Sequence, residues 1–256
     1  MSLLAAVAAS GAPQPVILIA DVGVDDAAAL LWALGTPSLE IVGIAASFGC
    51  HRDVIITARN AQLLIAAANR SHVPVYLGSR YPLGQASQLD LDGSAYHGDD
   101  GFGSVFEGEL DARAQAEMIE RYSAAEFIAN TARSRPGEVA VLCFSPLTNV
   151  ALAALIEPRL PTLLKALVVM GGALHVPGNV SPLAEANFAH DAVAAHLVVQ
   201  GFGAPTATCS FVLAPLDVTT RSSALLKASV VEGLRASGGR AAQLFARAHD
   251  FYSGVY

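Results

Sequence analysis

The sequence predicts an α/β fold in which helices flank an open, mostly parallel β-sheet. Continuous apolar runs such as residues 15–20 (PVILIA) are typical of strands covered on both faces, as in a parallel sheet. Segments rich in alanine and leucine follow these runs, and strands that alternate with helices form right-handed βαβ units. In addition, 53% of the 256 residues are hydrophobic and only 14% are charged, so a large fraction of the chain must be interior.

The first half of the chain predicts three strands and two helices in alternation. Strands are expected over residues 15–20, 40–47 and 73–78, and helices over residues 25–34 and 53–69. Asp53 stands near the start of the second helix, where a carboxylate commonly caps free backbone amides. Residues 79–112 are polar, rich in glycine and aperiodic, and a loop of this length in a compact domain is usually functional.

The second half continues the alternation. Helices are expected over residues 115–134, 146–156 and 190–200, strands over 138–144, 166–170 and 206–212, a second long loop over 173–186, and helical structure after that. The chain shows no internal repeat or low-complexity linker, so we expect one domain over residues 15–256 after a flexible tail over residues 1–14. The apolar part of that tail is also compatible with a short signal peptide, although it lacks a positively charged start.

The composition argues against several classes of protein. The formal charge is -7 and no run of basic residues is present, which argues against a nucleic-acid partner because phosphate contacts need clustered lysine and arginine. No apolar stretch of about 18 residues is free of polar breaks, so we expect neither a transmembrane helix nor a membrane partner. Cys50, Cys143 and Cys209 form no CxxC pair, so we expect free thiols in a reducing, cytoplasmic compartment rather than disulfides or a zinc site.

Three carboxylates, Asp21, Asp25 and Asp26, gather directly after the first predicted strand. In parallel α/β sheets ligands bind beyond the carboxyl ends of the strands, and neighbouring carboxylates repel one another unless a cation neutralises them. The nearest basic residue downstream is Arg52, so a metal ion is the natural counter-charge, and oxygen ligands favour Ca²⁺ or Mg²⁺. Asp25 and Asp26 could instead cap the following helix, but capping does not explain Asp21 at the end of an apolar strand.

Further motifs follow the carboxylates in a fixed order. The motifs are DVGVDD (21–26), RNAQ (59–62), HGDDGFG (97–103), SPLTN (145–149), EPR (157–159), MGG (170–172), GN (178–179) and AEAN (184–187). With these motifs in order over residues 15–256, the sequence resembles the inosine-uridine preferring nucleoside hydrolases. The resemblance implies a nucleoside hydrolase-like fold with a Rossmann-like core, in which one or two edge strands are not parallel.

The resemblance also implies a reaction. The family hydrolyses the N-glycosidic bond of ribonucleosides to free base and ribose, using a water bound to Ca²⁺. It therefore implies an enzyme with Ca²⁺ as cofactor, a small-molecule ribonucleoside as substrate, and a homodimer or homotetramer as assembly. Two alternatives are a nucleoside- or ribose-binding relative without catalysis, and a phosphohydrolase, although no basic residue for phosphate stands near the aspartates in the sequence.

Individual residues receive roles from the same resemblance. Asp21 is implied as general base and metal ligand, with Asp26 and the backbone carbonyl of Phe144 as further metal ligands. Asp25 is implied to hold the ribose hydroxyls. The other implied substrate-binding residues are His51, His97, Met170, Asn179, Glu185, Asn187, Tyr252 and Tyr256. Structural alternatives stay open: a plain surface histidine at position 97, loop caps at positions 179 and 185, and packing roles for the two tyrosines.

The sequence departs from the family pattern at several positions. Ile19 stands where the family has another Asp, Val22 where it has Pro, Ala186 where it has Phe, and Cys50 or His51 where it has a ribose-contacting Asn. The change at position 19 removes a carboxylate that would orient the metal ligands. The family's C-terminal segment carries a His-Asp pair that closes the metal shell and protonates the leaving base. That pair has no counterpart up to Tyr256, so we expect the segment to be lacking.

Overall fold

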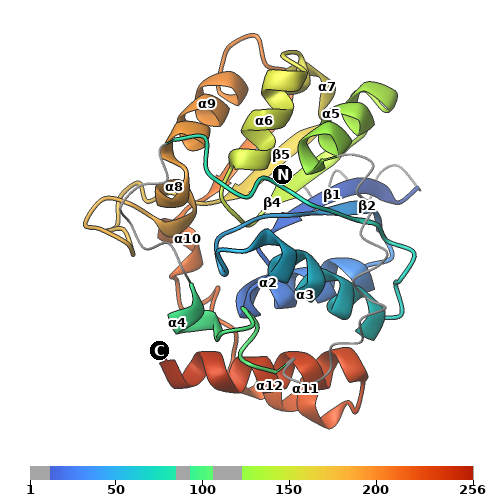
Figure 1. The fold of residues 1–256 in the computed structure, drawn as a ribbon, viewed down its shortest axis with the longest axis vertical. Coiled ribbons are helices and arrows are strands. Elements are labelled where there is room, and N and C mark those ends of the chain that lie inside the picture. Colours follow the sequence, from blue (N-terminus) through green and yellow to red (C-terminus); the bar gives the residue numbers. More distant parts are fainter. Residues whose placement is uncertain (1–11, 85–92, 106–122, 256) are drawn as a thin grey trace.

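A six-stranded sheet forms the centre of the structure, a computed structural model that describes residues 12–84, 93–105 and 123–255 (Figure 1). The strands are β1 (Gln14–Ala20), β2 (Leu39–Ala46), β3 (Val75–Tyr76), β4 (Ala140–Cys143), β5 (Ala166–Met170) and β6 (Ser210–Ala214). They lie in the order β3-β2-β1-β4-β5-β6, and every pairing between them is parallel. The predicted α/β fold with an open parallel sheet is confirmed, and the described residues contain no antiparallel edge strand.

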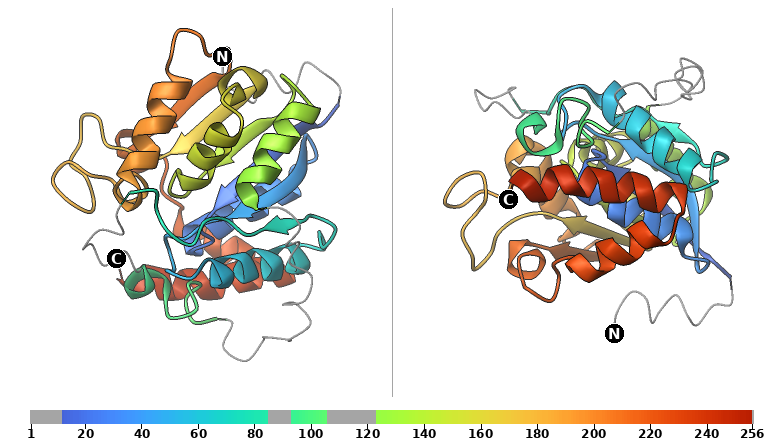
Figure 2. Two further views of the ribbon diagram at one scale, coloured as in Figure 1. Left: turned by 45° about the horizontal axis from the view of Figure 1, so that its top comes forward. Right: turned by 90° about the horizontal axis from the view of Figure 1, so that it is seen from below.

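Helices cover both faces of this sheet (Figures 1 and 2). One face carries α2 (Val24–Gly35), α3 (Val54–Ala67) and α12 (Arg240–Val255), and the other carries α5 (Ala124–Ser134), α6 (Thr148–Ile156) and α9 (Ala192–Phe202). The shorter helices are α4 (Ser94–His97), α7 (Leu160–Leu163), α8 (Ala186–His190), α10 (Leu216–Thr219) and α11 (Ala228–Ala236). Helix α12 packs against both α2 and α3, and none of the described helices has the length and apolar character needed to cross a bilayer.

Strand β1 is buried along its whole length because it separates two hydrophobic cores. Ile17 and Ile19 belong to the core under α5, α6 and α9, whereas Leu18 and Ala20 belong to the core under α2, α3 and α12. Alternate side chains of a strand point to opposite faces, so apolar residues are favoured at every position from Pro15 to Ala20. This requirement explains the uninterrupted apolar run from which the strand was predicted.

The strand order places a ligand-binding edge beside β1. The chain passes from β1 to β2 on one side, and it later reaches β4 on the other side of β1. In open sheets with this order, the loops diverge at the carboxyl ends of the two central strands and leave a crevice for ligands. Asp21 follows β1, and Phe144 follows β4, whose Cys143 pairs with Ile19. The two segments therefore meet at this switch point.

Some of the element boundaries predicted from the sequence agree with the structure, and others do not. Asp53 is the N-cap of α3, as predicted, and its Oδ1 accepts a hydrogen bond from Ile55 N at 3.0 Å. The strand predicted over residues 206–212 is present, but its predicted start is wrong, because β6 begins only at Ser210 and extends to Ala214. Thr208 N and Cys209 N both donate to Pro161 O, which holds the preceding residues in a loop. The short helices α7 and α8 have no counterpart among the predicted elements, since neither is long enough to show helical periodicity.

Replacing Leu18 with Ala tests the importance of β1 burial. Leu18 is fully buried, so Leu18→Ala should lower the free energy of unfolding by about 2–5 kcal/mol through lost apolar contact and a residual cavity. Urea unfolding followed by circular dichroism measures this change. The control is Leu155→Ala on α6, where Leu155 is 61% exposed and the expected change is at most about 0.5 kcal/mol. Similar effects of the two substitutions would contradict the role given to β1.

Candidate functional site

The turn between β1 and α2 carries the three aspartates to the carboxyl edge of the sheet. Asp21 and Asp26 are buried, with 4% and 5% of their surface exposed, whereas Asp25 is exposed. Gly23 N donates to Asp26 Oδ2 at 3.1 Å, which ties the turn to the start of α2. Val22 has φ of 32°, a conformation closed to Pro, whose ring holds φ near about −65°. The turn therefore differs in shape from the Pro-containing turn that the resemblance implies.

The loop after β2 lies against this turn. Cys50 N donates to Asp21 Oδ2 at 2.6 Å, and Cys50 Sγ lies 3.8 Å from Asp26 Oδ2. The approach depends on Gly49, which has φ of 148° and at which a Cβ would lie 2.0 Å from Asp21 Oδ2. Only glycine fits at this position without displacing the carboxylate. The glycine in front of Cys50 thus fixes how closely the backbone donor reaches Asp21.

Burial and neighbouring negative charge destabilise the ionised forms of the two buried acids, Asp21 and Asp26. Burial raises the pKa of Asp21, and burial together with the charge of Asp21 raises the pKa of Asp26 well above its ordinary value. Burial and the neighbouring carboxylates also raise the pKa of the Cys50 thiol. Among the described residues, no ion pair with Lys or Arg includes any of the three aspartates. Within the described part of the chain, this negative charge therefore has no Lys or Arg partner.

The donor set fits a divalent metal ion. Ligand atoms of Asp21, Asp26 and Cys50 all lie within 4.8 Å of one another. Two carboxylates suit a hard cation such as Ca²⁺ or Mg²⁺, which prefers oxygen ligands, while a thiol does not. The charge of such an ion would offset the burial and the carboxylate repulsion that raise the pKa values of Asp21 and Asp26. The hypothesis of a cation site at Asp21 and Asp26 therefore agrees with the charge and the geometry.

A second cluster lies at the ends of β4 and β5. Asn187 Nδ2 donates to Phe144 O at 3.0 Å and to Met170 O at 3.2 Å, and it lies 3.3 Å from Met170 Sδ. Asn187 is buried, with 9% of its surface exposed, and it lies in the first turn of α8. The structure thus brings together three of the predicted site residues from three separate segments. The Phe144 carbonyl, implied as a metal ligand, accepts the amide of Asn187.

Glu185 and Asn179 organise the second long loop. Glu185 is 2% exposed and caps α8, with its carboxylate accepting from Asn187 N at 2.8 Å, Gly172 N at 2.9 Å and Phe188 N at 3.1 Å. Asn179 is exposed, and its Oδ1 accepts from Ala186 N at 2.9 Å. These contacts match the loop-capping alternative considered for both residues. Their roles toward substrate stay predictions.

His97 lies beside the aspartate turn at the end of α4. Its Nδ1 accepts from Val24 N at 3.3 Å, and its ring lies 5.3 Å from that of Tyr252 on α12. The loop that follows is held by Asn60, whose Nδ2 donates to Asp100 O at 2.9 Å and to Val22 O at 3.4 Å. Asn60, from the RNAQ motif, is a positioning residue to which the sequence had suggested no role. His97 is half-buried against the turn and is not a plain surface histidine.

The remaining predicted residues are less closely joined to the carboxylates. His51 Nδ1 accepts from Asp53 N at 2.9 Å, so its ring is held at the start of α3. Of the two residues proposed to replace the family Asn, Cys50 is the one whose backbone N–H donates a hydrogen bond to Asp21. Tyr256 lies outside the described residues. Cys50, Cys143 and Cys209 are all buried free thiols, as predicted.

Comparisons with known proteins identify relatives of the chain. A sequence model described as "Inosine-uridine preferring nucleoside hydrolase" matches residues 16–256. A probable uridine nucleosidase 1 of Oryza sativa subsp. japonica is 40% identical over 184 residues, which make up 71% of this chain and 54% of that protein. The inosine-uridine preferring nucleoside hydrolase of Leishmania major is 31% identical over 249 residues, or 95% of this chain and 73% of that protein.

A solved structure gives the same result for the fold. The plant nucleoside hydrolase PpNRh1 superposes with a TM-score of 0.84 at 27% sequence identity, covering 95% of this chain and 72% of that chain. The chain therefore spans between 54% and 73% of the length of these three relatives.

A methyl group at position 49 should disrupt the carboxylate pair. Gly49→Ala would place a Cβ against Asp21 Oδ2, so we expect lower stability, by about 1–3 kcal/mol, and weaker cation binding. Urea unfolding and calorimetric titration with Ca²⁺ measure the two effects. Gly201→Ala on α9 is the matched control, because a Cβ there meets no atom within 4 Å, so this substitution should lower neither stability nor Ca²⁺ binding. Normal Ca²⁺ binding by Gly49→Ala would refute the proposed geometry.

The raised carboxyl pKa values predict an unusual dependence of stability on pH. Between the ordinary value of 3.8 and the higher folded-state pKa, the folded protein binds more protons at Asp21 and Asp26 than the unfolded chain. In chelator, this pair should therefore lower the melting temperature progressively as the pH rises through that window. Asp26→Asn should flatten the decline, and Ca²⁺ at neutral pH should raise the melting temperature of the unchanged protein. A pH-independent difference between the two proteins would contradict the expectation.

Proposed function

Because the chain belongs to the family of inosine-uridine preferring nucleoside hydrolases, we propose that it hydrolyses the N-glycosidic bond of ribonucleosides to free base and ribose. The observation that carries the proposal is the buried Asp21–Asp26 pair at the switch point of the sheet. The pair has no cationic partner among the described residues, and it lies where α/β sheets bind their ligands.

Ca²⁺ is the cofactor that we propose for this pair. Asp21 and Asp26 would hold the ion with their carboxylates, and the carbonyl of Phe144 would join them from the end of β4. When bound, such an ion lowers the pKa of a coordinated water, so that the water attacks at neutral pH. Oxygen donors alone do not separate Ca²⁺ from Mg²⁺, and the choice of Ca²⁺ comes from the family.

Asp21 is proposed as the general base. A water bound to such an ion would be more acidic than bulk water, and a carboxylate that contacts this water can accept its proton. The bond from Cys50 N to Asp21 Oδ2, at 2.6 Å, holds this carboxylate in one orientation. A fixed orientation lowers the entropic cost of reaching the geometry in which the attacking water transfers its proton to Asp21.

The ribose is proposed to bind between the two clusters. Asp25 is exposed on the aspartate turn, and Asn187 and Met170 lie at the ends of the neighbouring strands. Loss of the base leaves positive charge on the sugar, and fixed carboxylate and amide oxygens stabilise such charge. Further contacts to ribose are proposed for Asn179, Glu185 and His51.

The base is proposed to lie near His97 and Tyr252. Their rings are 5.3 Å apart, and an aromatic surface of this kind can contact a purine or pyrimidine. Tyr256 would extend the same surface. We leave the base preference open, because both uridine and inosine occur in the names of similar proteins. We further propose that the protein acts in purine salvage and assembles as a homodimer or homotetramer. We also propose a cytoplasmic location, because the three free thiols are typical of a reducing compartment.

Release of ribose from inosine, uridine and guanosine tests the reaction. We expect release by the calcium-loaded protein, its loss in chelator and its return with added Ca²⁺. Asp21→Asn should lower kcat by at least about 100-fold, the lower range for loss of a general base. The matched control, Asp250→Asn, changes an exposed residue paired with Arg235 on the outer helices and should retain activity. Nucleoside binding without hydrolysis by the calcium-loaded protein would instead favour the non-catalytic alternative.

A further inference from the structure

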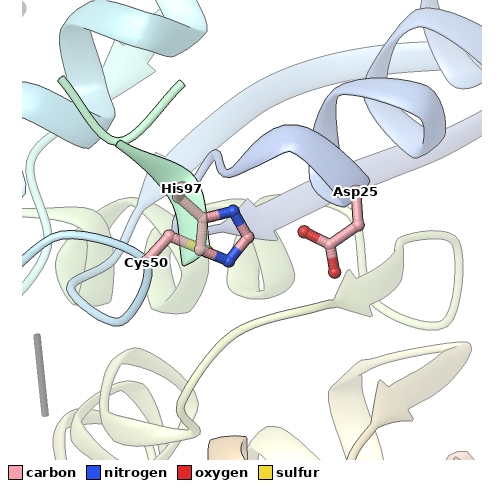
Figure 3. A group of neighbouring side chains, drawn as sticks. All are labelled: Asp25, Cys50 and His97. Carbon is pink, nitrogen blue, oxygen red and sulfur yellow. The ribbon is translucent and has the colours of Figure 1, made fainter. Parts of the chain in front are cut away.

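Asp25, Cys50 and His97 form a mixed cluster beside the carboxylate pair. They come from the first turn of α2, the loop after β2 and the end of α4. Figure 3 shows the imidazole ring between the cysteine side chain and the carboxylate of Asp25. One ligand atom from each residue lies within 4.8 Å of the other two, although the residues are far apart in the sequence. Three different metal-ligating groups therefore converge on one point.

The three groups can converge because residue 23 is glycine and has no side chain. A Cβ at Gly23 would lie 2.4 Å from Cys50 Sγ and 2.7 Å from His97 Nδ1, so any other residue would push the thiol and the ring away. The ring is held in place by the bond from Val24 N to His97 Nδ1, which at 3.3 Å is long enough to yield to a stronger partner. Asn60 also fixes the loop that carries the histidine, through Asp100 O. The fold thus keeps the three groups together in a defined arrangement.

We propose that Asp25, Cys50 and His97 form a binding site for a thiophilic divalent cation of the zinc type, separate in chemistry from the hard cation at Asp21 and Asp26. Thiolate, imidazole and carboxylate are the ordinary ligands of Zn²⁺, whereas Ca²⁺ takes oxygen ligands. Three protein ligands leave a fourth tetrahedral position open to solvent or to a substrate hydroxyl. On binding, the Cys50 S–H bond breaks, a metal–sulfur bond forms and the proton passes to the solvent.

The two cation sites are coupled through Cys50. Its sulfur lies within 4.8 Å of ligand atoms in both groups, so a cation bound to the thiolate also lies close to the Asp21–Asp26 pair. Two neighbouring divalent ions repel each other, and each should weaken binding of the other by the same factor. Zn²⁺ would also bind the carboxylate of Asp25, which we propose to bind the ribose hydroxyls of the substrate. We therefore expect Zn²⁺ to compete with nucleoside; this consequence, unlike the metal binding itself, rests on the proposed function.

Cobalt spectroscopy of the full chain tests the site without any need for activity. Co²⁺ serves as the probe, because a thiolate ligand gives a near-ultraviolet charge-transfer band, and Zn²⁺ should displace the Co²⁺ and abolish the band. The band should vanish in Cys50→Ala and persist in Cys143→Ala and Cys209→Ala, which remove the other two buried thiols. Absence of the band in the unchanged protein, or its persistence in Cys50→Ala, overturns the proposal.

A second variant keeps the test valid if Cys50→Ala fails to fold. His97→Ala alters a half-buried residue of a short helix and should weaken Zn²⁺ binding by more than about tenfold, since even groups behind the ligands contribute that much at zinc sites. His196→Ala, at an exposed position on α9, should bind Zn²⁺ normally. Unchanged affinity in His97→Ala overturns the site.

Inhibition is measured separately, with Ca²⁺ at saturation. Zn²⁺ should raise KM for nucleoside without lowering kcat. A charge-transfer band without hydrolysis refutes the proposed function and leaves the metal site standing. Hydrolysis without the band refutes the metal site and leaves the function standing.

Discussion

The repulsion between the buried carboxylates of Asp21 and Asp26 is the constraint on which the rest of the site depends. Removing a carboxylate from water costs several kcal/mol unless a cation or hydrogen-bond donors compensate. The protein supplies donors, Cys50 N to Asp21 and Gly23 N to Asp26, and leaves the remaining charge for an ion. The first contact requires Gly49, because a Cβ there would lie against Asp21 Oδ2, whereas a Cβ at Gly23 would lie against Cys50 Sγ and His97 Nδ1. These two glycines, which carry no functional side chain, thus help to decide whether the acids and their neighbours keep their geometry.

Most polar motif residues around the site bind the backbone, and their contribution is to hold loops in place. Asn149 joins the end of β2 to the segment after β3, donating to Ala46 O and accepting from Ser79 N, each at 3.0 Å. Asp191 accepts from Thr148 Oγ1 at 2.6 Å and from Leu83 N at 2.8 Å, and so connects α6 and α9 to the same loop. Because these side chains are buried and satisfied, the loops over the carboxyl edge keep a defined position. Rigid support of this kind is what a site needs when its ligand groups come from distant parts of the chain.

The parts of the structure that depend on local chemistry could be predicted from the sequence. The apolar run of β1, the cap at Asp53 and the position of the acids after a buried strand each follow from neighbouring residues, and the structure agrees with them. Contacts between distant segments could not be predicted in this way. Residues 206–209 include β-branched and small residues suited to a strand, yet Thr208 N and Cys209 N donate to Pro161 O, and β6 begins only at Ser210. Likewise, the spacing of the cysteines gave no sign of a metal site, since the partners of Cys50 come from other elements.

The central position of β1 has a consequence for the order in which the molecule can assemble. β1 pairs with β2 soon after both are synthesised, but its other neighbour is β4, so Val16 meets Ala140 only after the whole segment between them has been made. Contacts between segments so far apart form slowly, because a long loop must close before they bring any stability. Until then the apolar strand has one unpaired edge and one uncovered face, and it is exposed to association with other chains. The acidic turn at its end adds charge to that exposed segment, so the carboxylates that we propose as cation ligands in the finished protein also oppose aggregation of the nascent one.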